Sequence, residues 1–208
     1  MRLARVPVAG LCGLLGCLLL AAPARAFGYD GSRGPALGLP GDSITALAAP
    51  DLRSDVSGHY RYDIEGFPGA TLSQVDAIIT SMLHRDRPTP SVWVLDAGSD
   101  NAYLDRTNWQ PGLDTELHDV SGASRVVLVT INTNADRPSG NGIAQAINEA
   151  LFYVHDVDPS RYVVMNWNAL VHQHPGWLRP DGIHPNATGD AHYAAGVARA
   201  LGLAPSGR

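Results

Sequence analysis

The sequence predicts a three-layer α/β/α domain built on a doubly wound, mainly parallel sheet of five strands. The first observation is that apolar runs rich in β-branched residues alternate with segments of helical periodicity. The second is that most of these runs are continuous, which is typical of parallel strands covered on both faces. The third is that polar and glycine-rich residues follow the predicted strands, at the edge where open α/β sheets bind ligands.

Five segments are predicted as strands. Residues 91–95, 125–131 and 161–165 are the continuous apolar runs and fit strands covered on both faces. Residues 60–64 alternate more between apolar and polar side chains, which indicates an edge strand. Residues 36–39 form a short first strand.

Helical patterns lie between the strands. Thr71 and Gln74 have the spacing of a capping box, and an apolar stripe follows them as far as Leu83. Two further apolar stripes, over residues 143–154 and 187–201, predict helices that pack on the sheet.

The N-terminus has the features of an export signal. Arg2 and Arg5 precede an apolar run over residues 6–22, and the small-x-small sequence at 24–26 predicts cleavage after Ala26. We therefore expect a secreted or cell-envelope protein that has no stable membrane insertion once the signal is removed. An uncleaved membrane anchor is one alternative.

A lipoprotein signal that ends at Cys17 is another alternative. With cleavage after the signal peptide (residues 1–26), the chain divides into an irregular leader (27–36), one catalytic-type domain (37–204) and a short tail (205–208).

Composition excludes several classes of function. Both cysteines, Cys12 and Cys17, lie in the predicted signal, so the mature chain has no disulfide, thiol nucleophile or Cys-based metal site. Three of the 15 basic residues also lie there, which leaves 12 against 20 acidic residues and a net charge of −8. This charge argues against nucleic acids and anionic membranes as partners. All basic residues are Arg, which suggests a GC-rich bacterial genome.

Three residues that follow predicted strands suggest acyl-transfer chemistry. Ser43, in Gly-Asp-Ser, has two interpretations: a helix cap, which is the commoner use of such a serine, or a nucleophile. Asp181 and His184 are three residues apart, so one turn can direct both toward one point. The carboxylate would then hold one imidazole nitrogen while the other accepts the proton of Ser43.

These motifs resemble those of the SGNH, or GDSL-type, hydrolase superfamily, from Gly38 to about Leu203. The context "PDGIHPNATGDAHYA" is most similar to extracytoplasmic domains of bacterial envelope acetyltransferases and acetylesterases. No G-x-S-x-G elbow of an ordinary α/β-hydrolase is present in the sequence.

The resemblance implies a role for each matching residue. Ser43 would be the nucleophile, His184 the general base and Asp181 the carboxylate that orients it. The backbone N–H of Gly69, in "GFPGAT", would form an oxyanion hole with that of Ser43. No cofactor and no metal are needed for this chemistry.

One block departs from the pattern of the superfamily. The superfamily has Gly-x-Asn-Asp, in which the Asn amide donates to the oxyanion, whereas here Asp100 precedes Asn101. We expect Asn101 to take over the amide role through a one-residue shift. The alternatives are that Asp100 is a protonated donor, or that activity is weak because a carboxylate repels the developing charge.

Further polar residues are candidates for the substrate pocket. They are Asp42, Asn132 and Asn134, which follow predicted strands, and Trp167, which could equally pack in the core. His172 and His174 have no further ligand at a useful spacing and predict no metal site.

The sequence thus predicts a serine esterase that forms an acyl-enzyme on Ser43 and removes small, acetyl-like groups from a glycan or a small molecule. Short loops without a lid segment favour such small acyl groups over long lipid chains. One alternative is an O-acyltransferase with the same triad. The other is a weakly active or non-catalytic protein of the same fold that binds glycan.

Overall fold

The computed structural model describes residues 29–31 and 33–204. The predicted signal peptide (residues 1–26) and the predicted tail (205–208) lie outside these described residues. Within the described ranges, no helix is both long and apolar enough to cross a membrane.

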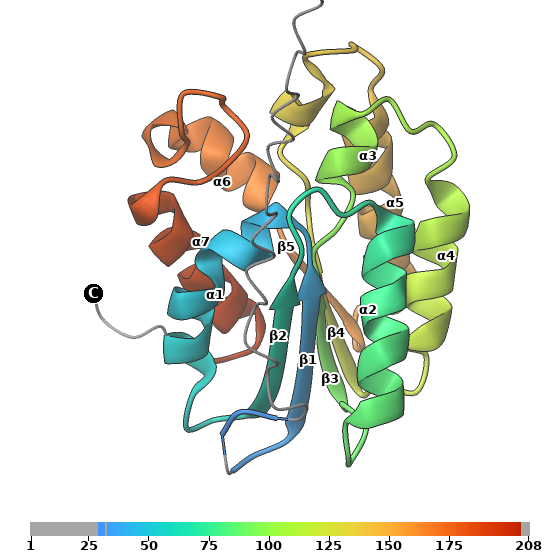
Figure 1. Ribbon diagram of the computed structural model, residues 1–208, viewed down its shortest axis with the longest axis vertical. Coiled ribbons are helices and arrows are strands. Elements are labelled where there is room, and N and C mark those ends of the chain that lie inside the picture. Colours follow the sequence, from blue (N-terminus) through green and yellow to red (C-terminus); the bar gives the residue numbers. More distant parts are fainter. Residues whose placement is uncertain (1–28, 32, 205–208) are drawn as a thin grey trace, which may run out of the picture.

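The centre of the molecule is a five-stranded parallel sheet with the order β2-β1-β3-β4-β5 (Figure 1). Its strands are β1 (Ala36–Gly41), β2 (Arg61–Gly66), β3 (Val92–Leu95), β4 (Arg125–Val129) and β5 (Tyr162–Met165). The chain runs from β1 outward to β2 and then crosses back to β3 and on to β5. This order confirms the predicted doubly wound α/β fold, and each predicted strand is present.

The two edges of the sheet differ from its middle. Strands β3 and β4 are almost entirely buried, and β2 lies at one edge, as its alternating pattern predicts. Strand β5 is the other edge, and the residues from Tyr162 to Val164 are only half-buried. The strand is nonetheless covered on both faces as predicted, because Val163 packs against one core and Tyr162 against the other.

Helices cover both faces of the sheet, which gives the three layers seen in Figure 1. The helices are α1 (Ser43–Val56), α2 (Leu72–Arg85), α3 (Ser99–Tyr103), α4 (Gln110–Asp119), α5 (Ile143–Val157), α6 (Trp167–Gln173) and α7 (Ala187–Ala200), with short 3₁₀ turns η1 (Thr133–Asp136) and η2 (Pro175–Trp177). Helices α1, α6 and α7 share one apolar core with the sheet, and α2 to α5 share the other. Each face of the sheet thus has its own core.

The three helices predicted from apolar stripes are present. Helix α2 begins directly after Thr71, and the side chain of Gln74 in its first turn accepts a hydrogen bond from the Thr71 backbone N–H at 2.9 Å. Helices α5 and α7 contain the other two apolar stripes. Helices α3, α4 and α6, of 5, 10 and 7 residues, were not predicted because they are too short or too polar to show a clear apolar period.

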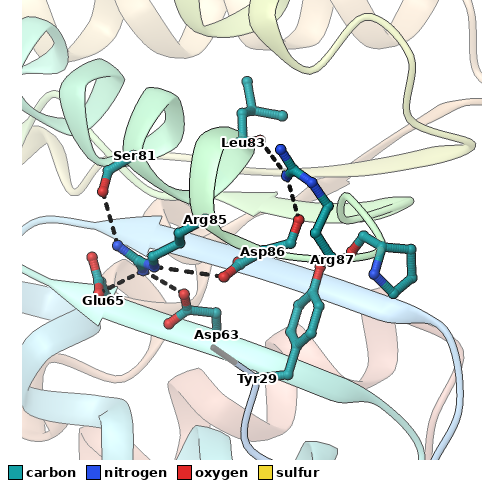
Figure 2. Close-up of polar contacts among 9 residues, drawn as sticks. Tyr29, Asp63, Glu65, Ser81, Leu83, Arg85, Asp86 and Arg87 are labelled. Carbon is teal, nitrogen blue, oxygen red and sulfur yellow. Dashed lines mark hydrogen bonds and ion pairs between the residues drawn. The ribbon is translucent and has the colours of Figure 1, made fainter. Parts of the chain in front are cut away.

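Two sets of contacts hold the edge strand β2 in place. Asp30, in the predicted leader, forms an antiparallel bridge with Tyr62, and each backbone N–H donates to the other's carbonyl oxygen at 2.8 Å. Figure 2 shows Arg85, at the end of α2, contacting Asp63 and Glu65 of β2. This interaction ties the helix to the edge strand.

Asp86 completes the ion cluster. Its carboxylate lies 3.5 Å from Nε of Arg85. Burial, together with the nearby charge of Asp63, raises the pKa of Asp86 to about 6. Arg85 thus contacts three carboxylates. The side chain of Asp86 is fully buried, whereas that of Glu65 is partly exposed.

Candidate active site

Ser43 lies at the carboxyl end of β1, where the strand turns directly into α1. The cap of this helix is Asp42, whose carboxylate accepts a hydrogen bond from the backbone N–H of Ile44 at 2.9 Å. A Cβ on Gly41 would lie 2.2 Å from Oγ1 of Thr45, so the close strand–helix turn requires glycine there. Since Asp42 supplies the cap, the hydroxyl of Ser43 is available for another contact.

That contact is His184. Oγ of Ser43 lies 3.0 Å from Nε2 of His184, and Nδ1 of the same ring lies 2.9 Å from Oδ2 of Asp181. A carboxylate can only accept, so Nδ1 carries the proton and Nε2 is the acceptor for the serine hydroxyl. The structure therefore brings together the three residues that the sequence singled out, across 141 positions of the chain.

Asp181 is held ionised by its own turn. Burial alone would raise the pKa of its carboxyl. Hydrogen bonds from the backbone N–H groups of Ile183 and His184, at 2.8 and 2.9 Å, and from the imidazole of His184 outweigh burial and lower the pKa below its usual value. The residue is thus a stable anion that can orient the imidazole.

Asn132 and Asn134, predicted as pocket residues, hold the turn that carries Asp181 and His184. Their Nδ2 atoms both donate to the carbonyl oxygen of Gly182, at 2.9 and 2.8 Å. Gly182 has a φ of +71°, a left-handed conformation that favours glycine. The two asparagines therefore act on the site through the position of this turn, and neither lines the hollow beside Ser43.

A hollow of about 220 Å³ opens beside Ser43. Its lining residues come from α1, α3 and the turn before α7: Ser43, Ser99, Asp100, Tyr103, Asp181, Ile183 and His184. Tyr103 is 49% exposed, so its ring lies at the rim. Small-molecule sites span roughly 300–1,000 Å³, so this hollow has room for a small group only.

The swapped Asp100-Asn101 pair lies in α3, and its two members face different surroundings. Gly98 precedes the helix with a φ of +114°, and a Cβ there would lie 2.6 Å from Cδ1 of Ile131. Asp100 lines the hollow beside Ser43, whereas Asn101 does not. Oδ1 of Asn101 instead accepts a hydrogen bond from the backbone N–H of Leu72 at 2.8 Å. The one-residue shift that was expected to bring Asn101 to Ser43 is therefore not seen.

Asp100 is half-buried at this position. Burial raises the pKa of its carboxyl, while the nearby His184 lowers it by a smaller amount. The carboxyl is therefore easier to protonate than one in water.

Gly69 lies in a turn that is fastened to the end of β1. The backbone N–H of Ala70 donates to the carbonyl oxygen of Phe67 at 3.1 Å, and Gly69 has a φ of +83°. With Pro68 at the second position, this is the pattern of a type II turn, which requires glycine at its third position. The backbone N–H of Phe67 donates to the carbonyl oxygen of Gly41 at 3.0 Å. The turn therefore begins beside the nucleophile strand, although Gly69 does not line the Ser43 hollow.

Two other predicted pocket residues are buried. Asp42 is 0% exposed beneath Ser43, and burial together with the nearby Asp96 raises its pKa well above the usual range. Trp167 is also 0% exposed and makes an edge contact with Tyr193, with ring centroids 5.2 Å apart. Of the two interpretations of Trp167, core packing is therefore correct.

Sequence reasoning missed three residues of the Ser43 hollow, namely Ser99, Tyr103 and Ile183. Ser99 and Tyr103 are four residues apart in α3 and so lie on one side of that helix. That signal was available only once the segment was known to be helical. His174, which had been weighed as a metal ligand, stacks on Trp177 with ring centroids 4.2 Å apart.

Comparison with known proteins adds information on the fold. No protein-family model and no curated protein sequence matches the chain. Solved structures do match it. The C-terminal catalytic domain of peptidoglycan O-acetyltransferase A (OatA) from Streptococcus pneumoniae, determined with a methylsulfonyl adduct, is 18% identical with a TM-score of 0.68. The match covers 82% of this chain and 94% of that domain.

Two further structures are similar over comparable lengths. A lipase/acylhydrolase from Enterococcus faecalis is 20% identical with a TM-score of 0.64, covering 84% of this chain and 100% of that one. A carbohydrate esterase family 3 protein from Talaromyces cellulolyticus is 17% identical with a TM-score of 0.63, covering 80% and 96%. The predicted resemblance is thus confirmed for the architecture, and the chain has the fold of the SGNH, or GDSL-type, hydrolases.

Proposed function

We propose that this protein is a serine hydrolase that acts on ester bonds through an acyl-enzyme on Ser43. The observation that carries the proposal is a pair of hydrogen bonds through one imidazole ring. Nε2 of His184 lies 3.0 Å from Oγ of Ser43, and Nδ1 of the same ring lies 2.9 Å from Oδ2 of Asp181. A serine hydroxyl becomes a nucleophile when a neutral imidazole can accept its proton, and an imidazole is held in that tautomer by an ionised carboxylate.

The reaction proceeds in two halves. Oγ of Ser43 attacks the ester carbonyl carbon while its proton passes to Nε2 of His184. The bond to the alcohol oxygen then breaks, and His184 returns the proton to that oxygen, which leaves an acyl group on Ser43. Water attacks the acyl carbon, gives its proton to Nε2, and the carboxylic acid departs as the proton returns to Ser43. Asp181 remains ionised and stabilises the imidazolium in each half.

The negative charge that forms on the carbonyl oxygen needs hydrogen-bond donors. The backbone N–H of Ser43, at the positive end of α1, is one, and the backbone N–H of Gly69 is a second. For the third we favour Asp100 in its protonated form over Asn101. Asp100 lines the same hollow as Ser43 and has a raised pKa, whereas Asn101 does not line that hollow.

The size of the site supports a small acyl group. The hollow of about 220 Å³ would accept an acetyl-like group and would exclude long lipid chains. Among the proteins of similar fold, one is a peptidoglycan O-acetyltransferase and another a carbohydrate esterase. We therefore favour an acetylated glycan as substrate. The likeness to the acetyltransferase domain also supports a second candidate, in which a sugar hydroxyl replaces water in the second half-reaction.

The place of action follows from the predicted signal. An export signal over residues 1–26 would deliver a cysteine-free mature chain to the cell envelope or the medium. N-terminal sequencing of the exported protein tests this, and the expected first residue is Phe27. An intact Met1 or a lipidated Cys17 would contradict it.

The decisive experiment is labelling with a fluorophosphonate probe together with hydrolysis of nitrophenyl acetate, butyrate and longer esters. Ser43→Ala and His184→Ala should each abolish nearly all activity, and the double variant should lose little more, because the two residues act as one unit. Asp181→Asn should also be severely impaired. The exposed residues Ser121 and His59 offer matched control variants, Ser121→Ala and His59→Ala, which should keep full activity.

The outcomes separate the candidates. A folded protein that is not labelled and hydrolyses none of the esters would be a binding protein of this fold. Release of acetate from an acetylated glycan distinguishes the esterase from the transferase, which would pass the acetyl group to an added oligosaccharide.

A further inference from the structure

A second hollow lies next to helix α3, and it differs in character from the one beside Ser43. Its volume is about 470 Å³, which falls in the range of small-molecule sites. Every residue that lines it has a polar side chain: Thr71, Ser73, Gln74, Asn101, Asp105, Arg106, Thr107 and Asn108. We name it the polar hollow. It has no large apolar side chain on which an acyl chain could pack.

The polar hollow and the catalytic hollow share one element, helix α3. Asn101 lines the polar hollow, and its neighbour Asp100 lines the catalytic one. Thr71 lines the polar hollow and follows Gly69 of the oxyanion turn by two residues. A ligand that spans both hollows would therefore pass along α3, where Tyr103 offers an exposed ring at the rim of the catalytic hollow.

Asn101 gives the polar hollow an unused donor. The side chain is only 4% exposed, and its Oδ1 accepts from the backbone N–H of Leu72. Its Nδ2 group has no hydrogen-bond partner among residues 29–31 and 33–204, although Asn101 lines the hollow. A ligand oxygen in the hollow can therefore accept a hydrogen bond from this amide.

The charges in the polar hollow cancel. Asp105 and Arg106 are its only ionisable residues. Asn141 fixes the Asp105 carboxylate with a hydrogen bond of 3.0 Å, and the backbone N–H of Arg106 donates to the carbonyl oxygen of Asn101 at 2.7 Å. A hollow with one cation, one anion, and otherwise amides and hydroxyls fits an uncharged ligand that both donates and accepts.

We propose that the polar hollow binds an uncharged saccharide unit of the alcohol portion of the ester, beside the acyl group at Ser43. This inference rests on the proposed function for its place in the reaction, but binding at the hollow is independent of turnover. Sugar hydroxyls supply the acceptor for Nδ2 of Asn101 and partners for the hydroxyl and amide groups of Thr107 and Asn108.

The test uses the full exported chain carrying Ser43→Ala, so that no ester is consumed. Binding of tri-N-acetylchitotriose, a neutral oligosaccharide, is measured by calorimetry and by NMR chemical-shift changes. We expect saturable binding that moves the backbone signals of residues 105–108. A Thr107→Leu/Asn108→Leu double variant should bind at least about tenfold more weakly, because two polar partners are replaced by apolar bulk.

Matched controls keep the result interpretable. Ser121→Leu makes the same kind of change at an exposed position outside the polar hollow and should leave the affinity unchanged. Thermal melts of each variant verify folding. Equal affinity in the double variant, absence of saturable binding, or binding only to an anionic sugar such as N-acetylglucosamine 6-sulfate would each overturn the proposal.

The two proposals fail in different ways. If the protein with Ser43 intact resists the fluorophosphonate probe while Ser43→Ala still binds the oligosaccharide, the proposed function is wrong and the saccharide site stands. If the serine is labelled but the oligosaccharide does not bind, the saccharide site is wrong and the proposed function stands.

Discussion

Replacing Asp100 with Asn tests how the oxyanion is stabilised. The substitution keeps the size and shape of the side chain beside Ser43 and changes only its chemistry. In the wild type, a protonated Asp100 donates to the oxyanion, whereas an ionised one repels it. Since burial raises the pKa of Asp100, the protonated fraction is larger than in water, but it still falls as pH rises through that pKa.

The expected magnitude follows from the loss of one donor. Removing an oxyanion donor typically lowers kcat by about 10²–10³, or about 2.7–4 kcal/mol. An amide donates at every pH. The ratio of kcat for Asp100→Asn to kcat for the wild type should therefore be near one at low pH and should climb toward that factor as Asp100 ionises. The general base His184 must be neutral for turnover in both proteins, so this requirement acts in the same direction on both pH profiles.

The assay is kcat for nitrophenyl acetate between about pH 4 and 9. Asp114→Asn removes the same charge from an exposed position on α4 and should follow the wild type at every pH. A ratio that is independent of pH, or an Asn variant slower than the wild type throughout, would refute the role of Asp100. If instead Asn101→Ala lost about 10²–10³ in kcat without loss of thermal stability, Asn101 would be the donor after all.

Three further predictions concern positioning and stability. Asn132→Ala combined with Asn134→Ala should lower kcat more than it raises KM, because the turn with the general base loses both hydrogen bonds to Gly182; unchanged kinetics would contradict this. Glu116→Gln should stabilise the protein above about pH 4.3 and not below it. Glu116 is 1% exposed and burial raises its pKa, so the folded state loses stability as pH rises toward that pKa, by about 1.4 kcal/mol per unit of separation. Thermal melts at two pH values measure this, with about 2–4 °C expected per kcal/mol. Arg85→Met should destabilise the protein by about 1–3 kcal/mol near neutral pH, since it leaves neighbouring carboxylates uncompensated; denaturation at pH 4, below the pKa of about 6 of Asp86, should show a smaller deficit.

The fold could be predicted because the sheet dominates the sequence pattern. Continuous apolar runs such as 125–131 predict strands that are buried on both faces, and the glycine and polar residues after them indicate one edge of the sheet. The contact of Ser43 with His184 spans 141 positions, yet it was predictable because both follow strands that end at the same edge.

The parts that sequence reasoning missed depend on which side of a short element a residue faces. Helix α3 has five residues, too few for an apolar period, so nothing in the pattern showed that Asp100 faces Ser43 and that Asn101 faces Leu72. The carboxamides of Asn132 and Asn134 were expected to contact substrate, but they donate to the backbone carbonyl oxygen of Gly182. Every residue has such a carbonyl group, so the sequence does not show which one an asparagine will bind.

The short bridge between Asp30 and Tyr62 has a consequence for the exposed edge of the sheet. A strand at the rim of a sheet presents backbone groups that another chain can pair with, which is a common route to aggregation. Here Asp30 of the leader pairs with the outer side of Tyr62, and β2 also carries the charged residues Asp63 and Glu65. A chain shortened to begin at β1 would keep its catalytic residues but would offer that rim to a second copy. We therefore expect removal of the leader to increase pairing between copies at this edge.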